Sequence, residues 1–293
     1  MKSLSNKISF SRISFLLKKE FFESRKIFSL RALILVAIFT SISLLVGMNN
    51  TDHYNSITES IKNSPTGKYI SSSYISDDDL TPTGVPIDNA TESLFAIFMF
   101  AMPIVIAVST SLTFERMSNK RKKISFLMTP ATTLEKYITQ ALIYSVGTFL
   151  LTASAFFIAD IIRYILFSMA YPNYGVIQTI PYTKYLSKAF SEPRFNNPLL
   201  IYLSSIAFTG SIYTLGSSIW PRLSFIKTFG FMSALGFTFL FTAITFGNSN
   251  SLLFSFDSDF ATNLICTLLY IAPIINYTLA YFRFKESEII QRM

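Results

Sequence analysis

Apolar residues gather into six long windows that hold few or no charged residues, and polar segments separate these windows. The windows cover about residues 31–49, 93–114, 137–160, 198–220, 228–247 and 260–282. A helix that crosses a bilayer needs roughly 20 mostly apolar residues. The pattern therefore predicts an all-α integral membrane protein, in which six transmembrane helices form a single transmembrane domain over residues 1–293.

A seventh apolar window, residues 164–183, is weaker than the other six. Its apolar run stops near Tyr171, and two prolines and a glycine follow. Such residues favour turns and loops. We therefore interpret this window as an outer extension of the third helix, followed by a loop.

Two charged residues, Asp160 and Arg163, lie on this extension. Residues three apart on a helix are neighbours and can pair. We expect an ion pair just beyond the lipid headgroups. The alternative is a functional relay inside the membrane, where ionisable residues are rare and usually have a role.

The distribution of charge predicts the orientation of the chain. Its 25 basic and 17 acidic residues give a net charge of +8. With the N-terminus in the cytoplasm, six spans place 19 basic residues inside and 6 outside, but 6 acidic residues inside and 11 outside. Basic residues favour the cytoplasmic side. We therefore expect both termini in the cytoplasm and six passes through the membrane, and we interpret the positive charge as an orientation signal with no nucleic-acid partner.

Residues 7–30 precede the first span and form a predicted amphipathic helix in the inner membrane interface. Apolar side chains recur there at helical spacing, and basic side chains cover much of the remaining surface. The spaced positions are Phe10, Ile13, Leu17, Phe21, Ser24 and Phe28, and the basic ones are Arg12, Lys18, Lys19, Arg25 and Lys26. The alternative is a plain helical lead-in to the first span. No cleavage site follows the first apolar run, so we expect that span to remain as an anchor.

The outer loop over residues 50–92 is long and polar. Its acidic run, Asp77 to Asp79, lacks the spaced ligands and the glycine of a calcium-binding EF-hand loop. We interpret it as a solvated loop that can contact a partner protein.

Residue types needed for common active sites are scarce. The chain has one histidine, His53, and one cysteine, Cys266. The segment from Thr66 to Tyr69 resembles the end of a nucleotide-binding loop but lacks its first glycine and its last hydroxyl residue. The sequence therefore predicts no catalytic residue, metal site or cofactor on this chain, and no enzyme activity of its own.

Small residues four positions apart occur in two predicted spans. Ala207 and Ser211 lie in the fourth span, and Gly230 and Ala234 lie in the fifth. Such pairs let helices approach closely. We expect them to pack within one bundle, and a seam between two copies is the alternative.

The inner loop over residues 115–136 carries the most informative motif. A basic run follows Glu115 and Arg116, and a proline then precedes Thr132 and Glu135. A threonine followed three residues later by a glutamate is a capping box, which satisfies free N–H groups at a helix start. We therefore expect a structured loop in which a new helix begins at Thr132 or Thr133.

This loop resembles that of permeases from ATP-binding-cassette transporters of the type-2 (exporter) class, in the form common in Bacteroidetes-type members. Two further segments are similar to that subgroup, residues 215–228 and 276–285. The residues that carry the resemblance, and that it places in a loop coupled to an ATPase, are Glu115, Arg116, Lys120, Arg121, Lys122, Lys123, Leu127, Met128, Pro130, Glu135 and Lys136.

The resemblance implies a multi-pass subunit of a bacterial inner (plasma) membrane that works as a dimer, either with a second copy or with a homologue. It also implies a separate cytoplasmic ATPase subunit that binds ATP and magnesium and receives the 115–136 loop in a groove. The substrate and its direction stay open. An alternative from a different class is a non-transporting assembly or anchoring protein, whose outer loop binds a partner.

Overall fold

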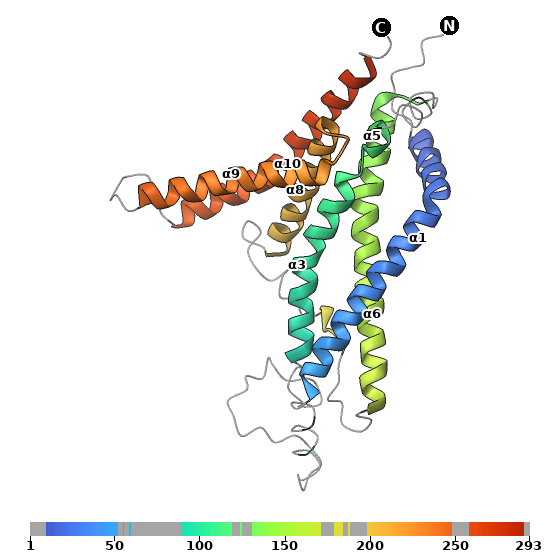
Figure 1. Cartoon of the computed structure of the whole chain (residues 1–293), viewed down its shortest axis with the longest axis vertical. Helices are drawn as coiled ribbons and strands as arrows, with labels where there is room; N and C mark the ends of the chain where they lie inside the picture. Colours follow the sequence, from blue (N-terminus) through green and yellow to red (C-terminus); the bar gives the residue numbers. More distant parts are fainter. Residues whose placement is uncertain are drawn as a thin grey trace. The chain divides into compact units, whose positions relative to one another are not determined.

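The computed structural model of the chain describes residues 10–51, 55, 59, 89–118, 124, 131–170, 179–183, 187, 198–247 and 258–289 (Figure 1). The regular elements in these ranges are all helices. Among the residues that the structure describes, four helical segments are long and apolar enough to cross a membrane: Phe10–Asn49, Ala90–Ser111, Thr133–Ala170 and Pro198–Ile219. Their length and composition are those of a membrane-embedded, all-helical protein.

In chain order the elements are α1 (Phe10–Asn49), α3 (Asn89–Ser111), the short 3-10 helix η2 (Glu115–Ser118), α5 (Thr133–Leu142), the π-helical turn η3 (Ile143–Gly147), α6 (Thr148–Ala170), α8 (Pro198–Ile219), α9 (Ser224–Gly247) and α10 (Ser258–Ile289). Each of the six predicted windows overlaps one of these helices or, for the third window, the run α5–η3–α6. The end of α6 at Ala170 confirms that the seventh window begins as an extension of the third helix.

The amphipathic segment and the first predicted span form one uninterrupted helix, α1, of 40 residues. Ser29, Leu30 and Arg31 stand where the two predicted parts meet. None of them breaks a helix as proline or glycine would. The sequence therefore offers no reason for the helix to stop before it enters the apolar window.

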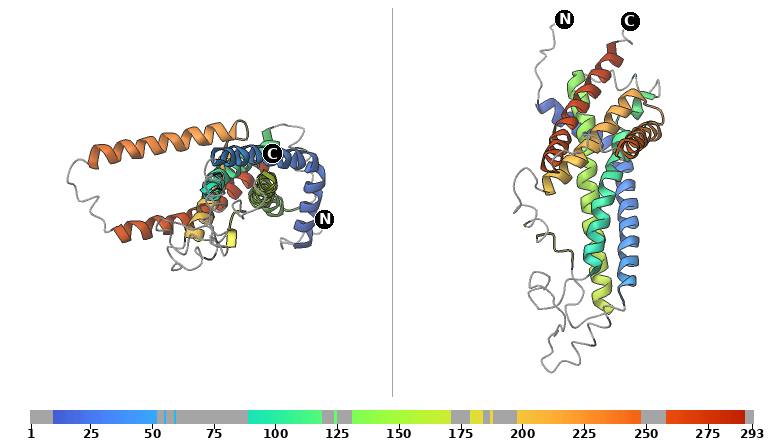
Figure 2. Two further views of the ribbon diagram at one scale, coloured as in Figure 1. Left: turned by 90° about the horizontal axis from the view of Figure 1, so that it is seen from below. Right: turned by 90° about the vertical axis from the view of Figure 1, so that its left-hand side faces the viewer.

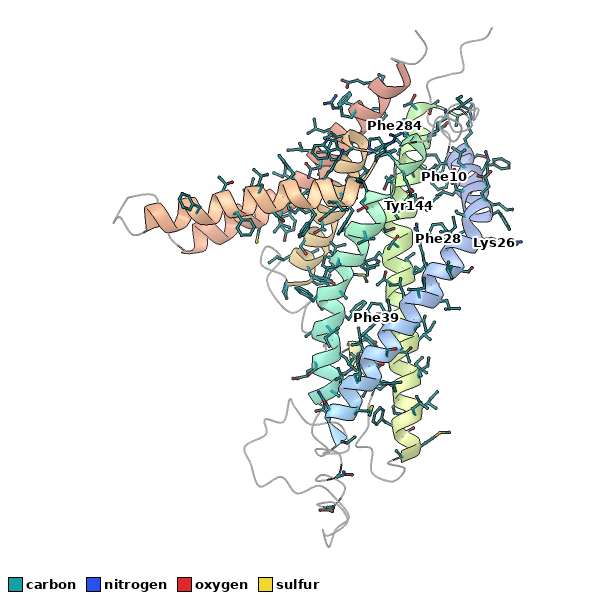
Figure 3. The ribbon with its side chains drawn as sticks, viewed as in Figure 1. Phe10, Lys26, Phe28, Phe39, Tyr144 and Phe284 are labelled. Carbon is teal, nitrogen blue, oxygen red and sulfur yellow. The ribbon has the colours of Figure 1, made fainter. Side chains whose placement is uncertain are left out.

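The chain forms two compact units, and one of them consists of Ser24–Met102 and Leu150–Ser187. In this unit α1, α3 and α6 lie side by side (Figure 2). The ring of Phe156 in α6 stacks on Phe98 of α3 at 4.2 Å and meets the edge of Phe39 of α1 at 5.7 Å. Phe39 is labelled in Figure 3. Gly47 lets α1 approach α6, because a Cβ atom at this position would lie 2.6 Å from the ring of Phe167.

The other unit consists of Met1–Glu23, Pro103–Phe149 and Lys188–Met293. Its core includes Phe114, Tyr137, Ala280 and Phe284, and α10 packs along α8. A short turn with Leu223 in a left-handed conformation (φ 56°) joins α8 to α9. Helix α9 then passes so close to α8 that a Cβ atom at Gly216 would overlap the Thr228 side chain.

The two predicted small-residue pairs have different surroundings in this second unit. Ser211 of α8 is buried and accepts a hydrogen bond from the Asn276 side chain of α10 at 3.1 Å, as expected for packing within the bundle. Gly230 of α9 has no described atom within 4 Å of the position that its Cβ would take, and Ala234 is exposed. Among the described residues, the prediction of packing within the bundle is therefore wrong for the α9 pair.

Candidate functional site

The residues predicted to couple the chain to an ATPase all lie in the inner loop, residues 115–136. Glu115 and Arg116 lie in η2, where the Glu115 side chain is exposed. Glu135 and Lys136 lie in the first turn of α5, and both are buried. The remaining predicted positions are outside the described residues, namely Lys120, Arg121, Lys122, Lys123, Leu127, Met128 and Pro130.

The predicted capping box at the start of α5 is confirmed. The Glu135 N–H donates to the Thr132 hydroxyl at 3.3 Å, and the Thr132 N–H donates to the Glu135 carboxylate at 3.0 Å. Thr132 has the extended conformation of an N-cap residue, with φ −68° and ψ 154°. Because the Glu135 side chain is completely buried, its carboxylate stabilises the helix start and is not presented at the surface.

Aromatic rings connect both ends of the 115–136 loop to the last helix. Phe114 stacks on Tyr137 at 6.0 Å and on Phe284 of α10 at 5.1 Å. Phe284 is labelled in Figure 3. Tyr137 also meets the edge of Tyr281 at 5.6 Å. We call these four residues the aromatic cluster. The residues before and after the loop therefore share one packed site on α10.

A hydrogen bond adds to this connection. The Tyr137 hydroxyl donates to the backbone carbonyl of Tyr277 at 2.7 Å. Neither the cluster nor this bond was predicted from the sequence. The signal that could have found them is the pair of aromatic residues that directly flanks the loop, one on each side.

Several small hydroxyl side chains are buried in the unit that contains the aromatic cluster. Most of them donate to a carbonyl of their own helix, as Thr110, Thr139 and Thr214 do at 2.7 to 2.8 Å. Ser109 and Thr148 bond to each other across helices at 2.6 Å. These pairings satisfy hydroxyl groups in an apolar interior and allow close helix packing. Within the described ranges, no group of three or more His, Cys, Asp or Glu residues could hold a metal ion.

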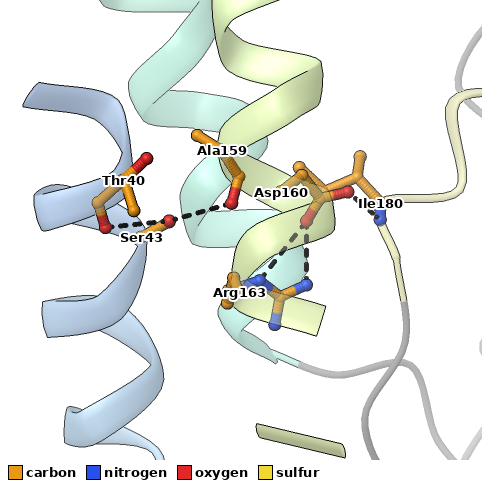
Figure 4. Close-up of polar contacts among 6 residues, drawn as sticks. All are labelled: Thr40, Ser43, Ala159, Asp160, Arg163 and Ile180. Carbon is orange, nitrogen blue, oxygen red and sulfur yellow. Dashed lines mark hydrogen bonds and ion pairs between the residues drawn. The ribbon is translucent and has the colours of Figure 1, made fainter. Parts of the chain in front are cut away.

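The unit formed by α1, α3 and α6 contains a buried ion pair between Asp160 and Arg163, which confirms their predicted pairing (Figure 4). The two side chains are 2% and 0% exposed, and Arg163 Nη2 lies 3.0 Å from Asp160 Oδ1. The second carboxylate oxygen of Asp160 accepts the N–H of Ile180 at 3.0 Å. Asp160 therefore connects α6 to the segment around Ile180, which follows this helix in the chain.

Tyr182 lies beside this ion pair. Burial and, to a smaller extent, the negative charge of Asp160 raise the pKa of its hydroxyl above the ordinary value, while Arg163 acts in the opposite direction. The hydroxyl is buried and has no hydrogen-bond partner among the described residues. The neutral phenol is therefore the form that fits this position.

The N-terminal part of α1 exposes large aromatic side chains. Phe10 is 85% exposed and Phe15 72%, and Phe21 and Phe22 are more than half exposed. Only Ile13 and Leu16 are buried among the described apolar residues before Glu23. The exposed phenylalanines lie beside exposed Lys18 and Lys19. The described surface of this segment is therefore both apolar and basic.

Protein-family models, curated proteins and solved structures were compared with the chain, and none of them matches it.

Proposed function

We propose that the chain is the membrane subunit of an ATP-driven exporter of the type-2 class. In this proposal six helices cross the inner membrane of a bacterium, with both termini in the cytoplasm. Two such subunits, identical or homologous, work with two cytoplasmic ATPase subunits that bind ATP and magnesium. Movement of the ATPases pushes on the 115–136 loop and drives a substrate across the membrane.

The observation that carries the proposal is the attachment of both loop ends to α10. Close-packed side chains transmit displacement, because such interiors are barely compressible. A force on the loop near Glu115 would reach Phe114 and Tyr137, and from them the ring of Phe284. This arrangement suits a loop that converts motion of a partner into motion of a long apolar helix.

The surface of the N-terminal segment supports the proposed interfacial position of that segment. An interfacial helix places aromatic side chains at the boundary of the acyl chains and basic side chains near anionic headgroups. The exposed Phe10, Phe15, Lys18 and Lys19 fit this arrangement. A segment made for an aqueous surface would not expose so many phenylalanine rings.

Co-purification tests the partnership. The chain is expressed with the ATPase encoded by a neighbouring reading frame, and the variant Glu115→Ala/Arg116→Ala/Pro130→Ala is compared with Lys285→Ala. Lys285 is an exposed basic residue outside the loop. We expect the loop variant to lose both the complex and stimulation of ATP hydrolysis, whereas the control retains both. If the loop variant keeps both the complex and the stimulation of ATP hydrolysis, the proposed docking of the 115–136 loop on the ATPase is wrong.

Reporter fusions test the six-span arrangement. Fusions after Lys123 and Met293 should report the cytoplasm, and fusions after Met48, Glu192 and Asn250 should report the outer side. A cytoplasmic signal at Glu192 would overturn the arrangement. If the topology holds but no ATPase co-purifies, the anchoring function becomes the better explanation.

A further inference from the structure

A cavity of about 470 Å³ lies within the unit that contains the aromatic cluster, among α3, α5, η3, the start of α6, α8 and α10. Small side chains create the space, including Ala141 of α5 and Ala207 of α8. Larger apolar side chains form its walls, including Ile106, Phe149 and Ile206. Pockets for small molecules have volumes of about 300–1,000 Å³. The cavity is therefore large enough to hold a ligand.

The polar groups that reach the cavity already have partners. Ser145 donates to the carbonyl of Ala141 at 2.6 Å, and the Tyr137 hydroxyl donates to the Tyr277 carbonyl. The Tyr277 hydroxyl is hydrogen-bonded to Ser145 and Thr214. A polar ligand would lose its water without gaining a free partner from these groups, and such burial is costly. The lining therefore selects an apolar ligand.

The π-helical turn explains why one wall of the cavity is continuous. Tyr137, Ala141, Ser145 and Phe149 are four positions apart, and all four line the cavity. In an α-helix, positions four apart drift round the axis by roughly 40° at each step. A π turn holds more residues than an α turn and therefore opposes this drift. The turn at Ile143–Gly147 keeps the wall facing one direction.

The rim of the cavity faces outwards from the helices. Leu142, Val146 and Leu203 line the cavity, and each of them is between 39% and 48% exposed. These residues lie on two of the segments that are long and apolar enough to cross a membrane. The medium next to such exposed leucine and valine side chains is hydrocarbon rather than water.

The size of the cavity decides between a lipid chain and a protein helix. A helix about 10 Å in diameter fills roughly 420 Å³ in a single turn of 5.4 Å. The cavity could therefore hold no more than about one turn of a partner helix, whereas a thin, flexible alkyl chain can bend to follow its apolar walls. We infer that the cavity is a binding site for one acyl chain of a membrane phospholipid. This site is independent of the proposed exporter function and requires only that α5, α6 and α8 lie in lipid.

Photolabelling in a bilayer tests this site. The full chain is reconstituted into phosphatidylcholine nanodiscs that contain a phosphatidylcholine with a diazirine in the middle of one acyl chain. After irradiation, labelled positions are mapped by peptide mass spectrometry. We expect adducts to concentrate on Ala141, Leu142 and Ala207, well above those on Phe229 and Phe231, which are exposed on α9 away from the cavity. Equal labelling of both sets would overturn the inference.

Filling the cavity provides the second part of the test. In Ala207→Phe the new ring should displace part of the acyl chain from the cavity. If about two methylene groups of the chain are displaced, the affinity and hence the labelling of the cavity should fall roughly tenfold. Ala234→Phe, at an exposed position of α9, is the matched control and should leave labelling unchanged. If Ala207→Phe does not fold, Ala207→Leu replaces it. Unchanged cavity labelling in a folded Ala207 variant contradicts the site.

Discussion

The Tyr137 hydroxyl donates a hydrogen bond of 2.7 Å to the backbone carbonyl of Tyr277 and so joins the start of α5 to the middle of α10. The ring of Tyr137 belongs to the aromatic cluster, so one side chain supplies both an apolar and a polar contact. In an apolar interior the carbonyl of Tyr277 gains a partner in addition to its own helix. This contact holds the end of the inner loop in a fixed position.

Removing only the hydroxyl should therefore have a measurable effect. We expect Tyr137→Phe to keep the ring packing and to destabilise the detergent-solubilised protein by about 1 kcal/mol, the usual net value of a hydrogen bond. Thermal unfolding followed by circular dichroism measures the change. Tyr164→Phe, at an exposed position of α6, is the control and should match the wild type. Equal stability of both variants would mean that the hydrogen bond does not contribute.

The contact between Gly216 and Thr228 predicts a clash that a second substitution relieves. Gly216→Ala should destabilise the protein by about 1–3 kcal/mol, the usual cost of overpacking. Gly216→Ala/Thr228→Ala should recover most of this loss, because the second change removes the atoms that the new methyl group meets. Thermal unfolding of both variants gives the comparison.

Gly236 provides a matched control on α9, since no described atom lies within 4 Å of the position of its Cβ. Gly236→Ala should be neutral or stabilising by up to about 1 kcal/mol, because alanine favours a helix more than glycine does. A loss of stability at Gly216 that Thr228→Ala does not relieve would contradict the proposed contact.

The buried ion pair predicts strong coupling between Asp160 and Arg163. Arg163→Met should cost about 3–5 kcal/mol, because it leaves a buried carboxylate without its counter-charge. Asp160→Asn/Arg163→Met should be much more stable than this single variant, since both charges are gone and the side-chain amide oxygen introduced by Asp160→Asn can still accept the N–H of Ile180. A double-mutant cycle from thermal unfolding measures the coupling, and additive losses would contradict it.

The position of Tyr182 predicts a difference at alkaline pH. In the unfolded chain its hydroxyl ionises near pH 10, whereas in the folded protein its pKa is raised. Unfolding therefore releases a proton above about pH 10, and the contribution of Tyr182 to stability falls as pH rises through that range. We expect Tyr182→Phe to lose less stability than the wild type between neutral pH and about pH 11. Thermal unfolding at a series of pH values measures the difference. If the wild type and Tyr182→Phe lose the same stability over this range, Tyr182 does not contribute to the pH dependence.

Local features of the fold were predictable because the sequence encodes them within a few residues. Thr132 and Glu135 form their capping box with each other, and Asp160 and Arg163 pair along one helix. The helix positions likewise follow from apolar windows, since a bilayer needs a minimum helix length. These predictions needed no knowledge of which helices are neighbours.

Contacts between distant helices were not predictable by the same reasoning. Phe114 and Phe284 are 170 positions apart, and a single sequence does not show that their rings meet. The exposure of Gly230 was missed for a related reason, because small residues mark a surface that can pack but not which helix covers it. The cavity depends on six elements at once, and one of them is a π turn that the apolar pattern does not reveal.

The short separation of Asp160 and Arg163 also bears on how the chain enters the membrane during synthesis. The pair lies at the outer end of the predicted third span, where a lone charge on the apolar helix still opposes insertion, at a cost that reaches about 2.5–3.5 kcal/mol at a helix centre. Because these two side chains can meet as soon as one turn of α6 has formed, the helix can enter as a neutral unit before α1 and α3 pack against it. A counter-charge on another helix would leave α6 unpaired until assembly. The local pair therefore makes the insertion of α6 independent of the order in which its neighbours arrive.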